Sequence, residues 1–445
     1  MKKALVSFIE NFVKNNFIIS LRIQLFVFKI KYRSVSSKKR KIAVVNTFDR
    51  SGGAAKVATT LFKGLGEDFS MQYYVKKKQS SDLGVVEIQQ EDYSFFLELL
   101  RRESVKKGWL EFTGFHALNL LKDTFFQQSK LVHLHNLHGE FFSPGLFSIV
   151  LSGKKVIWTL HDERILTGHC SCTLGCDSWK LGCGNCPDLT IYPSVNHDQT
   201  TLVLKETKKW INALNPVIVC PSEWLSKRVK MAYPFLNNVC VIPNGVDTSV
   251  FKPMQRREIR NEFELPLEKK IILFVAEFST NNPFKGGSIL RTLIKDPAFD
   301  HVLFVTVGGE TKSEYLNHLS FPYLDDEQTL AKLYASSDVL LYPTQADNFP
   351  LVVLESMACG TPVIASNLGG IPEIINDSSI GYLIDQYTDK QFFKQELLRF
   401  LDKNEEEMEF MRSRCVQLIQ KEYSKEKMLK KYGELYTKML NDYAD

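Results

Sequence analysis

The stretch "SSDVLLYPTQADNFPLVVLESMACGTPVIASN", residues 336–367, decides the fold. It contains a short apolar run, a polar loop, a helix-forming segment that begins near Pro350, and a second apolar run. Proline suits the first position of a helix, and near-continuous apolar strands are typical of a sheet that is covered on both faces. The stretch therefore predicts one parallel β–α–β unit.

Similar apolar runs recur in two series, with helical stretches between them. The first series covers 41–47, 130–136, 154–162, 215–222 and 238–244, and the second covers 269–277, 301–309, 336–344, 361–367 and 381–385. Two series predict an α/β chain with two Rossmann-like halves, and the turn signal Asn244-Gly245 places their join within 243–253. We expect an extension at 1–40, domains at 41–245 and 246–425, and a helical tail at 426–445.

The basic charge is concentrated at the N-terminus. Residues 1–41 hold eleven Lys or Arg and one acid, whereas the whole chain carries only +5. This distribution argues against a nucleic-acid-binding surface. The amphipathic, basic start predicts an anchor on anionic lipid, although a helix packed on the body or a loose extension remains the alternative. The apolar run at 17–28 is shorter than the ~20 residues of a spanning helix, and no signal-peptide cleavage site follows it.

Polar residues follow the predicted strands, where open parallel sheets bind ligands. Gly52 and Gly53 follow the first strand and allow a ligand to approach the backbone at a helix start. Asp347 precedes the helix that begins near Pro350, and Glu355 lies eight residues after Asp347. The start of this helix predicts a phosphate cradle, made by the segment of Asn348, Phe349, Pro350 and Leu351.

Taken together, these motifs resemble the GT-B glycosyltransferases of the large family 4 of retaining enzymes. That family has an acid, seven residues and a Glu, followed by "ACGTPV", and the resemblance extends from residue 41 to about 430 through "PSEWL", "IPNGVDTSVFKP", Lys285-Gly286 and "GGIPEII". It implies two Rossmann-like domains facing a cleft. It also implies a nucleotide-diphosphate sugar as donor, with Asp347 on sugar hydroxyls, Glu355 on the ribose and Lys285 on the diphosphate.

The chain departs from the family pattern at two positions. Asp347 stands where Glu is commonest, and an Arg that many members carry before Lys285 is absent, with Glu277 and Phe278 near its place. The diphosphate would then rest on Lys285 and on backbone amides. No Asp-x-Asp motif is present, so we expect no obligate catalytic metal.

Histidines follow two strands of the first half. By the resemblance, His161 contacts the donor sugar where the acceptor attacks, with Asp162 beside it. We interpret His135, Asn136 and His138, together with Asp162, as residues on the acceptor side. From the pattern alone, satisfied core histidines are an equally good interpretation of the "HLHNLH" segment.

Five cysteines lie within residues 170–186. Cys170, Cys176, Cys183 and Cys186 resemble a motif in transferases of colanic-acid and related polysaccharide clusters, and Cys172 is extra. Four thiolates at this spacing predict a structural zinc site, with reduced thiols, a disulfide or an iron–sulfur cluster as alternatives. In each case the cysteines would stiffen a loop and would not take part in the reaction.

The resulting hypothesis is a retaining, hexosyltransferase-like enzyme that moves a sugar to a glycan acceptor in bacterial surface polysaccharide synthesis. A basic anchor favours a lipid-linked acceptor and a cytoplasmic location, peripheral on the inner face of the membrane. Two alternatives stay open. One is a GT-B sugar-nucleotide epimerase, and the other is a metal-stabilised scaffold or binding protein with a degenerate cleft.

Overall fold

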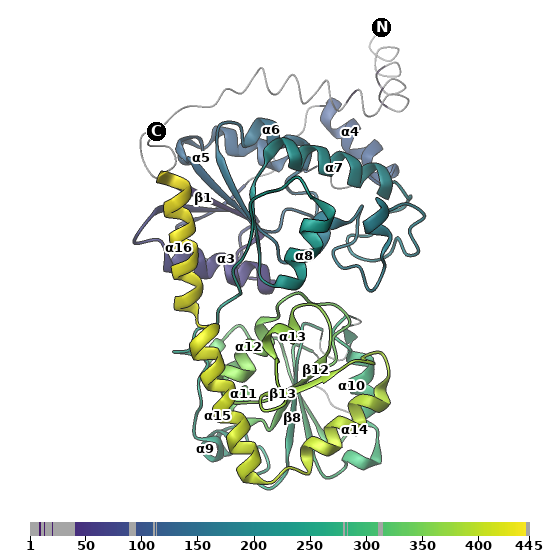
Figure 1. Cartoon of the computed structure of the whole chain (residues 1–445), viewed down its shortest axis with the longest axis vertical. Helices are drawn as coiled ribbons and strands as arrows, with labels where there is room; N and C mark the ends of the chain where they lie inside the picture. Colours follow the sequence, from purple (N-terminus) through teal and green to yellow (C-terminus); the bar gives the residue numbers. More distant parts are fainter. Residues whose placement is uncertain are drawn as a thin grey trace. The chain divides into compact units, whose positions relative to one another are not determined.

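The computed structural model describes residues 41–88, 95–109, 112, 114–278, 281–282, 284–309 and 315–441, with the single residues 9, 13 and 20. Apart from those three residues, the predicted extension at 1–40 lies outside the described part. The chain divides into two compact units, coloured along the sequence in Figure 1. Unit 1 comprises Met1–Pro221, Leu225–Ile242 and Lys431–Asp445, and unit 2 comprises Ser222–Trp224 and Pro243–Lys430.

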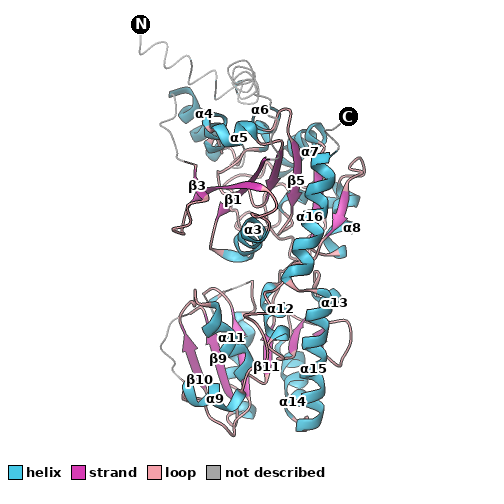
Figure 2. Cartoon of the chain, turned by 90° about the vertical axis from the view of Figure 1, so that its left-hand side faces the viewer, coloured by secondary structure: helices cyan, strands magenta, loops and turns pink. Residues whose placement is uncertain are grey.

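Unit 1 is built on a parallel sheet of seven strands in the order β3-β2-β1-β4-β5-β6-β7. The strands are β1 (Lys41–Phe48), β2 (Ser70–Lys77), β3 (Val85–Glu87), β4 (Leu131–Leu134), β5 (Lys155–Thr159), β6 (Val217–Cys220) and β7 (Val239–Val241). The α-helices between these strands include α3 (Gly52–Gly64), α4 (Phe95–Lys106), α5 (Thr124–Gln128), α6 (Phe147–Val150), α7 (Thr200–Leu214) and α8 (Glu223–Ala232). Figures 1 and 2 show α3 and α5 on opposite faces of β1.

Unit 2 has a parallel sheet of six strands in the order β10-β9-β8-β11-β12-β13. The strands are β8 (Ile271–Val275), β9 (Leu303–Val307), β10 (His318–Phe321), β11 (Val339–Tyr342), β12 (Val363–Ser366) and β13 (Gly381–Ile384). The helices are α9 (Arg256–Glu262), α10 (Gly287–Ile294), α11 (Glu327–Ser336), α12 (Leu351–Ala358), α13 (Ile371–Ile374), α14 (Lys390–Leu401) and α15 (Glu405–Glu422).

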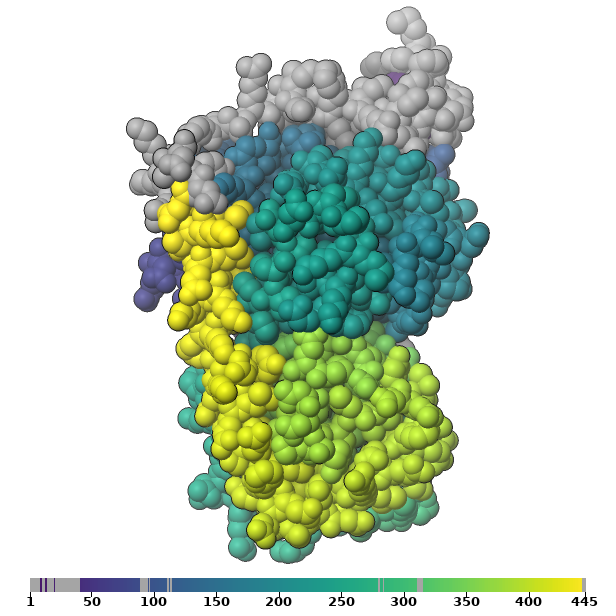
Figure 3. All heavy atoms as spheres, viewed as in Figure 1, coloured from purple at the N-terminus to yellow at the C-terminus, as the bar shows by residue number. Residues whose placement is uncertain are grey.

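Alternation along β8 explains why both faces of this sheet are covered. Ile271 and Leu273 enter a core with α11, α12 and α15, whereas Ile272 and Phe274 enter a second core with α10 and α14. Successive residues of a strand point to opposite faces, so a run without polar interruptions must be buried on both. Figure 3 shows the outer side chains of α14 and α15, in yellow-green and yellow, on the surface of unit 2.

The predicted α/β fold with two parallel sheets is confirmed, since each of the ten predicted runs contains a strand. The sequence did not indicate β2, β3 or β10. The described part of the predicted helical tail at 426–445 falls in α16 (Lys425–Asn441), and α15 ends before it at Glu422. None of the described helices combines the length and the apolar character that a membrane crossing requires.

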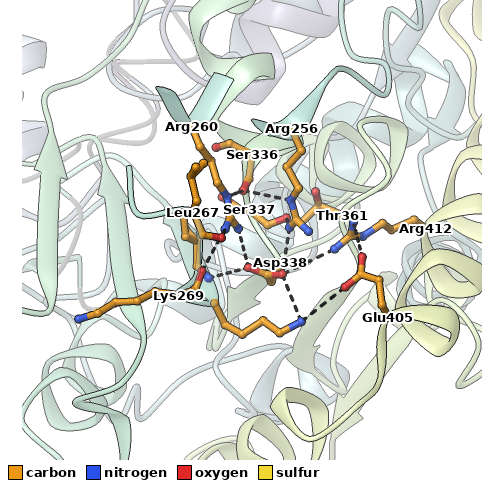
Figure 4. Close-up of polar contacts among 12 residues, drawn as sticks. Arg256, Arg260, Leu267, Lys269, Ser336, Ser337, Asp338, Thr361, Glu405 and Arg412 are labelled. Carbon is orange, nitrogen blue, oxygen red and sulfur yellow. Dashed lines mark hydrogen bonds and ion pairs between the residues drawn. The ribbon is translucent and has the colours of Figure 1, made fainter. Parts of the chain in front are cut away.

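A buried carboxylate at the start of β11 joins two helices of unit 2 to the sheet. Figure 4 shows Arg256, Arg260 and Arg412 directed at Asp338, which is 2% exposed. Their closest nitrogen–oxygen distances to the carboxylate are 3.1, 2.8 and 3.6 Å. One carboxylate oxygen also accepts the Ile271 amide at 2.6 Å. Asp338 thus links α9 and α15 to strands β8 and β11.

Candidate active site

Each sheet contains one point at which the strand order reverses, between β1 and β4 in unit 1 and between β8 and β11 in unit 2. In open parallel sheets, ligands bind beyond the carboxyl ends of the strands at such points. The loops after these four strands carry the predicted residues. Lys285 follows β8 and Asp347 follows β11, whereas Gly52 follows β1 and His135 follows β4.

The two charged residues of the unit 2 loops form an ion pair. The Lys285 ammonium contacts Asp347 Oδ2 and also lies 3.3 Å from the Ala346 carbonyl oxygen. The Tyr342 hydroxyl donates to the same Asp347 oxygen. Burial, followed by the charge of Asp347, raises the pKa of Tyr342 well above its ordinary value, so the phenol stays protonated. The structure therefore brings the predicted lysine and the first acid together and adds Tyr342, at the end of β11.

The segment before α12 is fixed by its own backbone. The Asn348 amide donates to Asp347 Oδ1 at 2.9 Å, and the Asn348 carbonyl accepts the Gly370 amide at 2.7 Å. Gly369 approaches so closely that a Cβ there would lie 2.0 Å from the Asp347 carbonyl oxygen. The "GGIPE" motif thus packs on the acid loop. One predicted cradle amide, that of Asn348, is already engaged by Asp347.

The second acid lies inside α12. Glu355 is 3% exposed, and its Oε2 accepts the Tyr334 hydroxyl at 3.1 Å. Burial, followed by the Glu355 charge, raises the pKa of Tyr334 well above its ordinary value. Each of the two acids is therefore held by a buried tyrosine. Neither tyrosine was predicted, because a tyrosine in an apolar run is indistinguishable from core packing until its hydroxyl is placed.

A cavity in unit 1 has an empty volume of about 510 Å³ and collects the predicted acceptor-side residues. Its lining includes His135, Asn136, His138, His161 and Asp162, together with the apolar side chains of Leu137, Phe142, Pro144, Trp158, Leu160 and Ile165. Two residues of β1 hold the loop after β4. Asn46 Oδ1 accepts the Asn136 amide, and the Thr47 hydroxyl donates to the Asn136 carbonyl, both at 2.9 Å.

The cavity histidines are paired. His135 Nδ1 lies 2.9 Å from His161 Nε2, and the two rings stack with centroids 5.2 Å apart. His135 Nε2 is buried and has no hydrogen-bond partner among the described residues. His138 Nε2 lies 2.9 Å from Asp162 Oδ2. Burial alone would raise the pKa of Asp162, but His138 and the Arg164 amide lower it, so Asp162 stays ionised.

A second buried polar network lies next to these rings. His133 Nδ1 is 2.6 Å from the Tyr436 hydroxyl, and His133 Nε2 is 2.7 Å from the Thr159 hydroxyl. Tyr432 completes it at 2.9 Å from the Thr159 hydroxyl. His133 is therefore a satisfied core histidine that fastens α16 to strands β4 and β5 within unit 1.

We expect the chain to lose stability when the pH falls from 6.5 toward 4. Burial lowers the pKa of His133 to about 3 and that of His161 to about 4, and it lowers that of His135 well below 6.5. The unfolded chain then binds protons that the folded chain does not, at about 1.4 kcal/mol per histidine and pH unit. Thermal unfolding should show a Tm that is flat above pH 6.5 and lower at pH 5, and an equal Tm at pH 7 and 5 would contradict this.

The remaining predicted residues lie at two other places in unit 1. Gly52 and Gly53 are exposed at the start of α3, and Gly52 has a φ of 84°, which favours glycine. None of the nine cysteines, all of which lie in the described part of the chain, forms a disulfide. Burial raises the pKa of Cys170 to about 11 and also raises those of Cys183 and Cys186, so they are not activated nucleophiles. In the described part of the chain, no three His, Cys, Asp or Glu side chains are placed to hold a metal ion.

Residues 255–414 match the family model described as "Glycosyl transferases group 1". The chain is 24% identical over 260 residues to the "Putative colanic acid biosynthesis glycosyl transferase WcaC" of Escherichia coli strain K12. That match covers 56% of this chain and 62% of the relative, so it spans less than two thirds of the relative's length. A "41.2 kDa protein in cps region" of Klebsiella pneumoniae is 27% identical to this chain. That match covers 60% of this chain and 68% of the relative.

Solved structures share the fold. Sucrose-phosphate synthase from Thermosynechococcus elongatus matches with a TM-score of 0.65 at 16% identity, over 91% of this chain and all of that one. HepE from Anabaena, solved in complex with UDP and glucose, matches with a TM-score of 0.62 at 14% identity, over 90% of this chain and 99% of that one. The family model covers 160 of the 445 residues and supports the predicted family for that part of the chain, and the two sheets match the predicted fold. Residues 255–414 thus form a group 1 glycosyltransferase domain, in a chain with the GT-B fold.

Proposed function

We propose that this protein transfers a sugar from a nucleotide-diphosphate sugar to a glycan acceptor, with retention at the anomeric carbon. The observation that carries this proposal is the cluster of Lys285, Asp347 and Glu355 at the switch point of the group 1 domain. HepE is named as a complex with UDP and glucose, which supports a nucleotide sugar as donor. The proposed role of this cluster is donor binding and stabilisation of the leaving diphosphate.

The hydrogen-bond inventory of the ion pair agrees with these roles. An ammonium has three donors, and Lys285 directs two of them at Ala346 and Asp347, which leaves one for a diphosphate oxygen. A carboxylate has about four acceptor sites, and Asp347 uses three of them for Lys285, Tyr342 and the Asn348 amide. The fourth would accept a hydroxyl of the donor sugar. Glu355 would accept from the ribose, alongside Tyr334.

Charge develops on the diphosphate as the glycosidic bond breaks. A preorganised ammonium next to that charge stabilises the transition state more than the ground state. In a front-face reaction, the departing diphosphate oxygen itself takes the proton of the acceptor hydroxyl, so no separate base is required. We propose that Lys285 and the backbone amides at the start of α12 provide this stabilisation, without an obligate catalytic metal.

The unit 1 cavity is the proposed acceptor site. Its apolar walls would pack on a sugar face, and His138 with Asp162 would bind hydroxyls. An unpaired buried polar atom costs about 1–3 kcal/mol, and an acceptor hydroxyl at His135 Nε2 would recover part of that cost. His161 would then lie at the donor sugar, as the resemblance implies.

The acceptor is proposed to be lipid-linked, with the basic residues 1–40 holding the protein at the inner face of the cytoplasmic membrane. One relative is named for colanic acid biosynthesis and another for a cps region, which supports a role in surface polysaccharide synthesis. A structural zinc in the cysteine segment is part of this proposal as a scaffold for the loop after β5.

Product analysis tests the function. The full chain is incubated with UDP-, GDP- and ADP-sugars and with undecaprenyl-diphosphate glycans in anionic vesicles. We expect one donor class to give a labelled lipid-linked glycan with retained anomeric configuration, at a higher rate than in zwitterionic vesicles. A changed sugar nucleotide without acceptor would instead identify an epimerase. If no donor is turned over and no nucleotide is released, the alternative of a non-catalytic scaffold or binding protein would be favoured.

A further inference from the structure

A second cavity in unit 1, with an empty volume of about 310 Å³, is surrounded by the cysteine segment. Its lining contains five side chains that can bind a soft metal ion, Cys170, Cys176, Cys183, Cys186 and His169. Cys172 is not among the lining residues. The segment lies beside the start of α7 (Figure 1), to which the Thr200 hydroxyl joins it by accepting the Gly184 amide at 2.9 Å. The cavity is therefore part of the folded unit.

His169 has the environment of a metal ligand. It is 3% exposed, and its Nδ1 lies 3.1 Å from the Pro193 carbonyl oxygen. A carbonyl only accepts, so Nδ1 carries the proton and the lone pair is on Nε2. Histidines that bind metals typically donate their other ring N–H to a carbonyl or carboxylate in this way. The free lone pair of His169 is directed at Cys186, with Nε2 3.3 Å from Sγ.

This separation is close to that of two ligands of one zinc ion. With Zn–N near 2.0–2.1 Å and Zn–S near 2.3 Å, a tetrahedral site places neighbouring nitrogen and sulfur atoms about 3.5 Å apart. Cys176 and Cys183 line the same cavity as His169 and Cys186. One imidazole and three thiols therefore line one cavity, and binding would have to draw them together.

The backbone of the Cys-x-x-Cys turn is held in an unusual conformation. Cys183 and Asn185 have φ values of 60° and 48°, in the left-handed region that asparagine tolerates but cysteine rarely adopts. Hydrogen bonds keep the turn in place, from the Cys183 amide to the Ser178 carbonyl at 2.8 Å and from the Cys186 amide to Asp198 at 2.6 Å. Such strain persists where the surroundings require it, often at ligand-binding sites.

We propose that this cavity binds one thiophilic divalent ion, best matched by zinc, through Cys176, Cys183, Cys186 and His169. These four side chains are the ligands of the structural zinc that is part of the proposed function. His169 takes the place of Cys170 in the predicted ligand set. Ligands in structural zinc sites are usually separated by two or more residues, so the neighbours His169 and Cys170 do not both fit. Binding would release the thiol protons and draw the side chains to coordinating distance.

The site is structural. Four protein ligands fill a tetrahedral ion and leave no open position for a substrate or for water. The ion would stabilise the loop that follows Asp162 along the chain. Glu163 stabilises the same loop. Its carboxylate accepts the Thr173 amide at 2.8 Å and pairs with Arg228 at 2.6 Å. The ion would thus hold the wall of the proposed acceptor cavity.

Metal analysis of the reduced, untagged full chain tests the assignment. Mass spectrometry of the metal should find one zinc per chain in the wild type, Cys170→Ser and Cys172→Ser, and none in Cys183→Ser. His169→Gln should weaken zinc binding by more than about a hundredfold, the upper range for loss of a partner that only supports a ligand. The rate of sugar transfer is measured on the same samples. It tests the proposed reaction, whereas the metal content tests the zinc ligands.

Cobalt substitution reports the ligands even where a variant folds poorly. The thiolate-to-cobalt absorption grows with the number of bound thiolates, so Cys170→Ser should leave the wild-type spectrum unchanged. A spectrum altered by Cys170→Ser, or one that His169→Gln leaves unaltered, would overturn the ligand set. Failure of the reduced wild type to take up zinc or cobalt would overturn the metal site itself.

Discussion

Substituting Asp338 by Asn should lower the opening free energy of the unit 2 sheet by about 3–5 kcal/mol, the usual effect of removing one partner from a buried ion pair. The change retains the shape of the side chain, but it leaves Arg256, Arg260 and Arg412 without their shared buried counter-ion. Asp338 is 2% exposed, so water cannot replace the lost carboxylate charge.

Hydrogen exchange is the suitable measurement, because two units need not unfold in one step. Amides of β8 and β11 should lose protection by a factor between about a hundred and several thousand. Glu262→Gln is the matched control. Its ion pair with Lys332, at 2.6 Å, has side chains that are 35% and 51% exposed, and such surface pairs contribute about 0–1 kcal/mol. Equal protection in the two variants would show that the Asp338 cluster does not hold the sheet.

Substituting Lys285 by Ala should lower kcat for sugar transfer by about 10²–10³, the effect of removing one preorganised donor from a developing oxyanion. The Lys285 ammonium is part-buried against Asp347, and Tyr342 still donates to that carboxylate in the variant, so the fold should be retained. Lys285→Arg keeps the charge but not the compact geometry, and it should recover only part of the rate.

Lys332→Ala is the control for this prediction, since it removes a lysine of the same domain outside the donor loops. Its rate should stay within twofold of the wild type. If Lys285→Ala transfers sugar at the wild-type rate, the diphosphate is stabilised by other groups and the proposed role of this lysine is wrong.

The parts of the fold that were predictable are those with a local signal. Buried parallel strands are apolar on both faces, so β1, β8 and β11 appear as uninterrupted runs. The strands β2 and β10 have mixed patterns, "SMQYYVKK" and "HLSF", and β3 has only three residues. Mixed or very short runs are not separable from loops by composition, whereas the edge strands β7 and β13, "VCV" and "GYLI", lie in apolar runs and were predicted.

The residues of the predicted site also divide into those with a local sequence signal and those without one. Lys285 and Asp347 lie in the loops after β8 and β11, at the switch point of unit 2, whereas His161 follows β5. Their partners were not predictable, because Tyr342, Tyr334 and His169 depend on where a hydroxyl or a ring nitrogen points in the folded chain. The sequence did offer one signal, a histidine within the cysteine segment, since histidine often joins cysteine in the ligand sets of structural zinc sites.

The most direct measurement is the thermal shift of the wild-type chain with UDP, GDP, ADP and CMP. A ligand that binds only the folded state stabilises it by about 2.7 kcal/mol at a hundredfold excess over Kd. We predict a clear rise in Tm with one nucleoside diphosphate, and its loss in Glu355→Ala, whose carboxylate is proposed to hold the ribose. No rise with any of the four nucleotides, for a protein that is folded and pure, would contradict the proposed sugar-nucleotide site.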